Sequence, residues 1–390
     1  MKKILWITER FPPMSGGMST SAQRQVSLLR RNGYQVDVMV FVPREVEDIK
    51  LDVKNRDCGN DIFILYADSI ANATQKGWQT VLEYSRCEKY DLIVGFGCNQ
   101  PGLIATTYAC WLGVPSMVSV RGNDFDRDWF DSRRHAMVAD TLSRADTVCC
   151  VTQEKVDKIQ ALYSNKMYPD KLVTWLPNGI DTDAYKVFAQ EHEKINSLRD
   201  ELGAGSKWII GIFGEIKYKK RIPFLIEVLR SNNLFDKVSL LLVGKMDYHV
   251  DSIFKDHSLV PQFKHISFRS QDEIALYYNA CDFVAIPSMF EGFPNVLLEG
   301  MVCGNVPLVS DSGAMPEVIS HKLNGFIFKT EDYESASASV IDALAMDKRE
   351  YQTISDNARQ TVLDRFSQEH ELESLKSIIE TTINSYALRA

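Results

Sequence analysis

The segment CDFVAIPSMFEGFPNVLLEGMVCGNVPLVSD (residues 281–311) decides the fold, because it holds one complete strand–loop–helix–strand unit. The apolar run FVAIPS predicts a buried strand, which the loop MFEGF follows. A helix is predicted over PNVLLEGMVCG, with Pro294 near its first turn and Gly304 closing it. The run NVPLVSD predicts the next strand. Chains that repeat such units build parallel sheets with helices on both faces.

The same order of elements occurs elsewhere in the chain. Apolar runs over residues 2–8 and 207–213 each lead through a glycine-bearing loop into a pattern of helical periodicity. The chain has 390 residues, and a single domain rarely exceeds about 250–300 residues. We therefore predict an α/β protein of two doubly wound parallel-sheet domains. The other buried strands are predicted at residues 34–41, 90–97, 114–120, 145–152, 237–244, 265–269 and 325–328.

Turn-forming residues in WLPNGIDTDAY (175–185) mark the change from the first domain to the second. We predict one domain over residues 1–182 and another over residues 183–366. The segment 367–390 is polar and predicted to be helical, because its apolar residues recur on one stripe. These residues are Leu372, Leu375, Ile378, Ile379 and Ile383.

Composition disfavours several other classes of protein. With 45% hydrophobic and 25% charged residues the chain is typical of a globular enzyme, and its formal net charge of −8 disfavours non-specific nucleic-acid binding. The eight cysteines form no C-x-x-C pair, which favours a reducing, cytoplasmic location. The N-terminal apolar run of about four residues is shorter than the roughly 7–15 of a signal peptide, and no window approaches the ~18 of a membrane span. Any membrane contact is therefore expected to be peripheral, at the inner face.

Two glycine-bearing loops follow predicted strands, where parallel sheets bind their ligands. In PPMSGGMS, Gly16 and Gly17 let the backbone approach a phosphate closely, or they only make a tight turn. Their spacing is not G-x-G-x-x-G, which disfavours a nicotinamide dinucleotide. In GEIKYKKR, a cluster of basic residues suits a diphosphate or forms a solvated face. This cluster consists of Lys217, Lys219, Lys220 and Arg221.

A third loop carries the first of two glutamates in a largely apolar context. Glu291 lies in the loop at the end of its strand, and Glu299 lies more than one turn inside the following helix. A carboxylate accepts two hydrogen bonds side by side, which suits a vicinal diol. Two diols with a diphosphate between them describe a nucleotide sugar. The alternative is structural: Glu291 interacts with the helix dipole, and Glu299 is a hydrogen-bonded polar group of the core.

These motifs together resemble the retaining GT-B glycosyltransferases of glycosyltransferase family 4. The resemblance rests on FEGFPNVLLE, GNVPLVSDSGAMPEVI and NGFIF, together with PPMSGGMS, LPNGIDTDAY and GEIKYKK, and it covers essentially the whole chain in the family's order. It implies two Rossmann-like domains facing a cleft, with the donor bound mostly by the second, the acceptor by the first, and the C-terminal helix crossing back onto the first. It also implies a nucleotide-diphosphate sugar as co-substrate without a further cofactor, a saccharide or lipid-linked glycan as acceptor, and a role in polysaccharide or glycolipid biosynthesis.

The resemblance assigns roles to individual residues. Glu299 is expected to hold the donor ribose, Glu291 the hydroxyls of the transferred sugar, and Lys220 the diphosphate. Gly17 is expected to offer its N–H group to a phosphate. The other residues expected on the donor side are Gly16, Gly214, Glu215, Gly292, Phe293, Pro294, Asn295 and Val296, with Gly244 and Arg269 in the loops beside the base.

Two positions depart from the family pattern. Many relatives carry Arg where this chain has Glu215; a variant pattern has a basic residue two positions later, which Lys217 fits. Many relatives carry His where this chain has Arg121, which cannot act as a neutral hydrogen-bond acceptor but can bind a sugar oxygen or a phosphate. Asp124, beside Asn123, is the nearest carboxylate for the acceptor, and a structural role near a helix start is an equal alternative.

The family mechanism implied by the resemblance is front-face attack with retention of configuration. Lys217, Lys220 and the helix starting at Asn295 would stabilise the leaving diphosphate, so no metal is expected. Two alternatives stay open. A sugar-nucleotide 2-epimerase would need more acid–base groups than the scattered histidines suggest. A non-catalytic sugar-nucleotide binder is suggested by Glu215 and Arg121. The sequence specifies neither the base, the sugar, the acceptor nor the oligomeric state.

Overall fold

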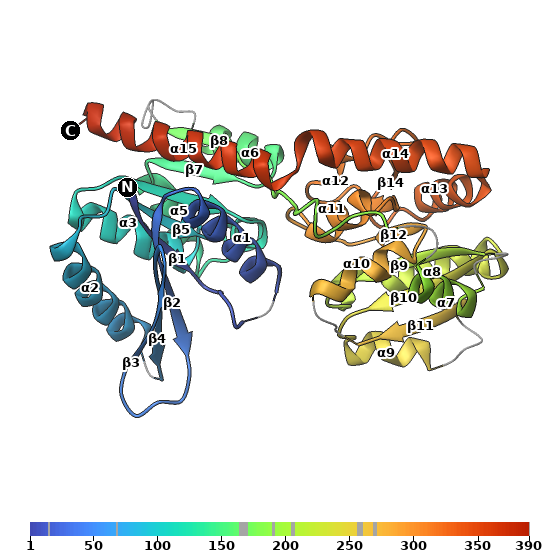
Figure 1. Ribbon diagram of the computed structural model, residues 1–390, viewed down its shortest axis with the longest axis horizontal. Helices are drawn as coiled ribbons and strands as arrows, with labels where there is room; N and C mark the ends of the chain where they lie inside the picture. Colours follow the sequence, from blue (N-terminus) through green and yellow to red (C-terminus); the bar gives the residue numbers. More distant parts are fainter. Residues whose placement is uncertain are drawn as a thin grey trace. The chain divides into compact units, whose positions relative to one another are not determined.

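The computed structural model divides into two compact units, each built on its own β-sheet (Figure 1). The N-terminal unit comprises Met1–Asn178 and Glu369–Ala390, and the C-terminal unit comprises Gly179–Gln368. The structure describes residues 1–14, 16–67, 69–163, 171–188, 192–203, 207–255, 260–267 and 271–389.

The sheet of the N-terminal unit has eight strands among the described residues, in the order β3-β4-β2-β1-β5-β6-β7-β8. All neighbours pair in parallel except β3, which is antiparallel to β4. The strands are β1 (Lys3–Thr8), β2 (Gln35–Pro43), β3 (Lys50–Arg56), β4 (Gly59–Tyr66), β5 (Leu92–Phe96), β6 (Ser116–Val120), β7 (Thr147–Cys150) and β8 (Leu172–Trp175).

Strand β1 marks the point at which the strand order of this sheet reverses. The chain runs from β1 through β2 to β4 on one side, and then from β5 to β8 on the other. At the carboxyl end of β1, Thr8 lies between Val40 of β2 and Phe96 of β5. In open α/β sheets, ligands bind beyond the carboxyl ends of the two strands between which the order reverses. For this unit that position lies beyond β1 and β5.

Helices cover both faces of the N-terminal sheet, which explains why β1 is apolar along its whole length. Ile4 and Trp6 join the hydrophobic core on one face, and Leu5 and Ile7 join the core on the other. The last helix belongs to the first of these cores, because its apolar stripe is buried there. The helices of the unit are α1 (Gly17–Arg31), α2 (Ile70–Cys87), α3 (Gln100–Leu112), α4 (Asn123–Asp126), α5 (His135–Arg144), α6 (Gln153–Tyr163) and α15 (Gln368–Arg389).

The C-terminal unit has a parallel sheet of six strands within its described part, in the order β11-β10-β9-β12-β13-β14 (Figure 1). The order reverses at β9, so the ligand position lies beyond the carboxyl ends of β9 and β12. The strands are β9 (Trp208–Phe213), β10 (Val238–Val243), β11 (Gln262–Ile266), β12 (Phe283–Ile286), β13 (Val306–Ser310) and β14 (Phe326–Phe328).

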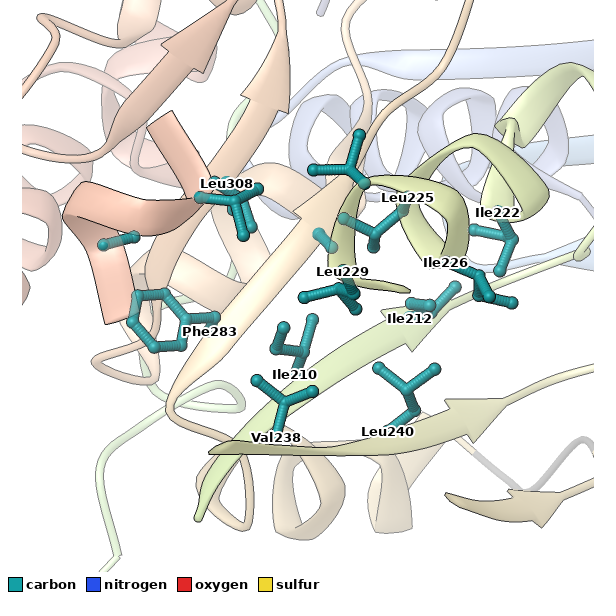
Figure 2. Close-up of a cluster of buried hydrophobic side chains, with 14 of the residues drawn as sticks. Ile210, Ile212, Ile222, Leu225, Ile226, Leu229, Val238, Leu240, Phe283 and Leu308 are labelled. Atoms are coloured by element: carbon teal, nitrogen blue, oxygen red, sulfur yellow. The ribbon is translucent and has the colours of Figure 1, made fainter. Parts of the chain in front are cut away.

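The core of the C-terminal unit holds these strands against their helices. In Figure 2, Ile210 of β9 and Val238 of β10 lie beneath Leu229 of the helix that connects the two strands. Short 3-10 turns, Tyr218–Lys220 and Phe235–Lys237, precede and follow that helix. The helices are α7 (Glu193–Glu201), α8 (Ile222–Ser231), α9 (Tyr248–Phe254), α10 (Gln271–Asn279), α11 (Asn295–Val302), α12 (Met315–Val318), α13 (Tyr333–Ala345) and α14 (Lys348–Arg365).

The prediction of two doubly wound sheets is confirmed, with three strands added and one moved. Strands β3, β4 and β8 were not predicted. The hairpin strand β3 is mostly exposed, so it lacks the apolar run of a buried strand. Strand β11 starts three residues earlier than the predicted 265–269, because it is a half-exposed edge strand in which the apolar signal is weak; residues 268–270 lie outside the described part of the chain.

Candidate functional site

Three loops meet where the strand order of the C-terminal unit reverses. The N–H group of Met289, after β12, donates to the carbonyl of Lys219, after β9, at 3.0 Å. The N–H group of Ala314, after β13, donates to the carbonyl of Gly292 at 2.9 Å. Gly313 has φ 59°, and a Cβ atom there would lie only 2.3 Å from the carbonyl oxygen of Glu291. Backbone contacts therefore hold the loop that carries Glu291 in place independently of its side chains.

Within this frame, Lys220 and Glu291 form an ion pair that bridges the loops after β9 and β12. Lys220 Nζ lies 2.9 Å from Glu291 Oε1, and the two side chains are only 14% and 10% exposed. Burial by itself raises the pKa of Glu291. The charges of Lys220 and Lys219 outweigh it, so the pKa lies below its ordinary value. Glu291 is thus a buried, ionised hydrogen-bond acceptor rather than a proton donor.

The N-terminus of α11 opens onto the same position. Pro294 is its N-cap residue and no side chain caps the first turn, so the helix presents N–H groups and the positive end of its dipole. A Cβ atom on Gly214, after β9, would lie 3.9 Å from Val296 in this turn, which places the loop after β9 beside it. Phe293 is buried, and its ring packs in a tilted arrangement against Phe366, with ring centroids 5.4 Å apart. Such a helix end favours an anion.

Glu299 lies one turn deeper in α11 and is held by a phenol that sequence reasoning missed. The hydroxyl of Tyr278, in α10, donates to Glu299 Oε2 at 2.7 Å, and its ring stacks on Phe213 with centroids 3.8 Å apart. Burial and the nearby carboxylate both raise the pKa of Tyr278, so the phenol stays protonated. Tyr278 lies in an otherwise unremarkable helical pattern, and no sequence signal pointed to it. This contact agrees with a structural role for Glu299, and it also orients the carboxylate.

Two glycines shape the strand ends beside this position. Gly214 and Gly244 have φ 91° and 133°, and a Cβ atom on Gly244 would lie 2.0 Å from the carbonyl oxygen of Gly214. Close approach of the two backbones therefore requires glycine at position 244 irrespective of any ligand.

Two other basic residues of the loop after β9, Lys217 and Arg221, pair with carboxylates other than Glu291. Lys217 Nζ pairs with Glu215 at 2.8 Å, and both side chains are about half exposed, at 48% and 56%. Arg221 pairs with Glu331 at 2.5 Å. The structure thus brings Lys220, but neither Lys217 nor Arg221, into a buried ion pair with Glu291. Arg269 lies outside the described residues.

In the N-terminal unit, the glycine pair starts a helix. Gly16 is the N-cap of α1 with φ 121°, a conformation that favours glycine, whereas a Cβ atom on Gly17 would meet nothing within 4 Å. The carbonyl of Gly16 accepts the N–H group of Thr20 at 3.0 Å. The positive φ therefore accounts for glycine at position 16, whereas the surroundings leave room for a side chain at position 17.

Arg121, at the end of β6, is engaged inside the N-terminal unit. Its Nη2 donates to Asn178 Oδ1 at 2.5 Å, and its guanidinium lies 4.5 Å above the ring of Phe96. Burial lowers the pKa of Arg121 to about 10. The same Asn178 oxygen accepts Nη2 of Arg24 at 3.3 Å, and Arg24 forms a buried pair with Glu371 of α15. These contacts stabilise the unit and hold Arg121 in one orientation.

The carboxylate of Asp124 is engaged by backbone N–H groups of the same unit. Its carboxylate accepts the N–H groups of Cys98 and Arg121, each at 3.0 Å, and links the loops after β5 and β6. Burial raises the pKa of Asp124, which these hydrogen bonds oppose. These contacts favour the structural alternative for Asp124. Of Asn123 the structure describes only the backbone, in the first turn of α4.

Neither a metal-binding cluster nor a membrane-spanning helix occurs among the described residues. No group of three or more His, Cys, Asp or Glu side chains in this part of the chain is arranged to hold a metal ion. No helix within it combines the length and the apolar character needed to cross a bilayer.

Comparison with known proteins identifies the family. The model of glycosyl transferases group 1 matches residues 194–361, and that of glycosyltransferase family 4 matches residues 15–184. An uncharacterised glycosyltransferase of Methanocaldococcus jannaschii is 25% identical over 99% of this chain and 98% of its own length. The Escherichia coli UDP-Gal:α-D-GlcNAc-diphosphoundecaprenol α-1,3-galactosyltransferase is 22% identical over 76% of this chain and 77% of its own.

Comparison of structures gives the same fold. HepE of Anabaena, solved with UDP and glucose, superposes with a TM-score of 0.74 at 19% identity, covering 98% of this chain and all of its own. Two α/β units, each with a reversal of strand order, match this architecture. The chain therefore belongs to the group 1 and family 4 glycosyltransferases and has their GT-B fold.

Proposed function

We propose that the chain transfers a hexose-type sugar from a nucleotide-diphosphate sugar to an acceptor hydroxyl, with retention of anomeric configuration. The observation that carries the proposal is the buried Lys220–Glu291 pair beside the uncapped N-terminus of α11. It combines a fixed cation and helix N–H groups for a diphosphate with an ionised carboxylate for sugar hydroxyls. The names of similar proteins support a nucleotide-sugar donor and an acceptor in glycan or glycolipid biosynthesis.

In the proposed reaction, the bond between the sugar's anomeric carbon and the diphosphate oxygen breaks while the acceptor oxygen bonds to the same face of that carbon. The acceptor's proton passes to the leaving phosphate oxygen. Lys220 and the first N–H groups of α11 stabilise the charge that develops on the diphosphate, and no divalent metal is required for this. Glu291 has a lowered pKa, so it holds hydroxyls rather than donating a proton. Glu299, oriented by Tyr278, accepts from the ribose hydroxyls.

The direct test is turnover of a panel of UDP-, GDP-, ADP- and dTDP-sugars by the purified chain, with and without EDTA. The expected result is slow donor hydrolysis without acceptor and transfer with one, both unaffected by EDTA. The anomeric configuration of the product is read by NMR. Inverted product would overturn the retaining mechanism, and loss of turnover in EDTA would overturn metal independence.

A second candidate is a sugar-nucleotide binder without turnover. The exposed Lys217–Glu215 pair and the inward engagement of Arg121 favour it, since neither side chain is held toward a donor. Binding of a nucleotide sugar with neither hydrolysis nor transfer, over the full panel, would support the binder over the enzyme.

A further inference from the structure

Of the four basic residues in the loop after β9, three form an ion pair with one carboxylate each. These pairs are Lys217–Glu215 at 2.8 Å, Lys220–Glu291 at 2.9 Å and Arg221–Glu331 at 2.5 Å. The fourth basic residue, Lys219, is half-buried, and its ammonium group forms neither an ion pair nor a hydrogen bond within the described part of the chain. The loop therefore carries one positive charge that no carboxylate of this part of the chain pairs with.

Lys219 lies beside the buried Lys220–Glu291 pair. Both lysines belong to the 3-10 turn that follows β9. The carbonyl of Lys219 accepts the N–H group of Met289 at 3.0 Å, two residues before Glu291. Burial raises the pKa of Glu291, and the charge of Lys219 acts together with that of Lys220 to bring this pKa below its ordinary value. Lys219 is therefore close enough to the site to influence the charge of a group in it.

A diphosphate at this site needs more positive charge than Lys220 supplies by itself. Lys220 already pairs with a buried carboxylate, and taking it away would leave Glu291 buried without its partner. Lys219 can turn toward a ligand without breaking an ion pair, because a lysine carries its charge on a flexible stem. Lys217 is the alternative cation, since its half-exposed pair with Glu215 is of a kind that contributes little energy.

We propose that Lys219 is a further catalytic residue of this transferase, whose ammonium group contacts the non-bridging oxygens of the donor diphosphate. There it stabilises the negative charge that develops on the diphosphate as the sugar leaves. The proposal rests on the function proposed above, because it adds a residue to the same site. Lys219 donates hydrogen bonds in this reaction, but it forms no covalent bond and transfers no proton. Lys220 shares its charge between Glu291 and the diphosphate, whereas Lys219 gives its charge to the diphosphate alone.

The test measures binding of UDP, GDP, ADP and dTDP to the whole chain by calorimetry, together with hydrolysis of the corresponding nucleotide sugars. Lys219→Ala is expected to weaken binding of the preferred nucleoside diphosphate about tenfold, because a charge-assisted hydrogen bond is lost. Donor hydrolysis should fall about 100-fold, since charge stabilisation is lost in the transition state. Lys219→Arg keeps the positive charge and should recover most of both. Lys348→Ala, at an exposed position in the first turn of α14, is the matched control and should behave as the wild type does.

Two further variants keep the test decisive. Lys219→Met retains the aliphatic stem and replaces Lys219→Ala should the latter fail to fold. Lys217→Ala removes the alternative cation, and a loss of diphosphate affinity there as large as in Lys219→Ala overturns the assignment to Lys219. Hydrolysis at the wild-type rate by Lys219→Ala or Lys219→Met overturns it as well.

These failures differ from a failure of the proposed function. In each of them the wild type still binds and hydrolyses a nucleotide sugar, so the proposed function stands without Lys219. A wild-type chain that neither binds nor turns over any nucleotide sugar of the panel overturns the proposed function and the role of Lys219 with it.

Discussion

Each unit places a glutamate at the edge of its sheet where the strand order reverses, after β1 in one sheet and after β12, the neighbour of β9, in the other, and the two glutamates have different surroundings. Glu291 follows β12 beside the reversal of one sheet, and Glu9 follows β1 beside the reversal of the other. Glu291 contacts Lys220, and its pKa lies below the ordinary value. Glu9 contacts the neutral Asn99, and its pKa lies above the ordinary value. Both sheets provide a ligand position where their strand order reverses, and the neighbouring charges determine what each position can bind.

The difference has a direct chemical meaning. A site with its own buried cation tolerates added negative charge, because Lys220 can be shared between Glu291 and a phosphate. At Glu9 the hydrogen-bond partner is the neutral amide of Asn99, which brings no positive charge to the carboxylate. Four predictions test this contrast, in order of the size of the expected effect.

The largest effect is expected when the cation of the C-terminal unit is removed. Lys220→Ala leaves Glu291 buried and unpaired, which should cost about 3 kcal/mol of unfolding free energy. Turnover of the donor should fall about 100- to 1,000-fold, because a fixed group that stabilises the leaving charge is lost. Denaturant unfolding and steady-state kinetics measure the two effects. Lys237→Ala, an exposed lysine before β10, is the control and should change neither. Wild-type turnover in Lys220→Ala would remove the lysine from the mechanism.

The second prediction concerns Glu299, a carboxylate of the C-terminal unit that is held by the neutral hydroxyl of Tyr278. Tyr278→Phe removes the hydrogen bond to Glu299 and should lower the free energy of unfolding by about 1–3 kcal/mol. Nucleotide affinity should fall with it, measured by calorimetry with the diphosphate of the preferred base. Tyr351→Phe is a matched control, since its buried hydroxyl donates to the carbonyl of Asp282 at the opposite end of β12. Tyr351→Phe should destabilise the unit without changing nucleotide affinity. An equal loss of nucleotide affinity in both variants would show that the effect of Tyr278→Phe comes from destabilisation of the unit as a whole.

The pH dependence of stability should have opposite signs at the two glutamates. The folded-state pKa of Glu291 is lowered, so its ionised form stabilises the protein above the unfolded pKa of about 4.3, and this contribution is lost as the pH falls through the lower folded value. Glu291→Gln should therefore lose stability relative to the wild type at pH 7 and much less near pH 3.

For Glu9 the folded pKa is raised, so ionisation disfavours the folded state as the pH rises from about 4.3 through the folded value. Glu9→Gln should therefore gain on the wild type with rising pH. Unfolding curves of both variants from pH 3 to pH 7 measure the trends. The same sign at both positions would break the contrast between the units.

The smallest effect is expected at Gly17, the second glycine of the pair that starts α1. Gly16→Ala places a side chain at φ 121° and should cost about 1–3 kcal/mol of stability. Gly17→Ala meets no neighbour and should change stability by less than about 1 kcal/mol. Thermal unfolding separates them. If Gly17 also offers its N–H group to a phosphate, Gly17→Ala keeps that group, and its nucleotide affinity should stay close to that of the wild type.

The sequence predicted the fold well where strands are buried on both faces. β1, β5, β9 and β12 are continuous apolar runs, and a short apolar run between turn residues is typical of a strand in a parallel sheet. The hairpin of β3 and β4 was not predicted. Strand β3 is mostly exposed, and neither its pairing nor its direction leaves a pattern in the local sequence. Strand β4 is an exception to the rule above, because it was missed although Ile62, Phe63 and Ile64 are buried on its two faces.

The site was predictable at the level of loops but not of partners. Sequence order indicated that Lys220 and Glu291 both follow strand ends, yet their pairing depends on β12 lying next to β9, which is a property of the whole sheet. Tyr278 and Asn99 orient their glutamates from other elements, and no motif carries them. Glu9 was overlooked because it immediately follows a strand and precedes a proline-rich loop, where a charged residue is ordinary.

Helix α15 completes the first core although it is joined to the chain after the whole C-terminal unit. Leu375, Ile378 and Ile379 are buried against that core, and Glu371 neutralises Arg24 there. During synthesis this apolar face therefore stays uncovered, and Arg24 lacks its carboxylate partner, until almost two hundred further residues, from Gly179 to Gln368, and then α15 itself have been made. The N-terminal unit can complete its core only after the C-terminal unit has been synthesised, so a chain truncated before α15 keeps an incomplete N-terminal core.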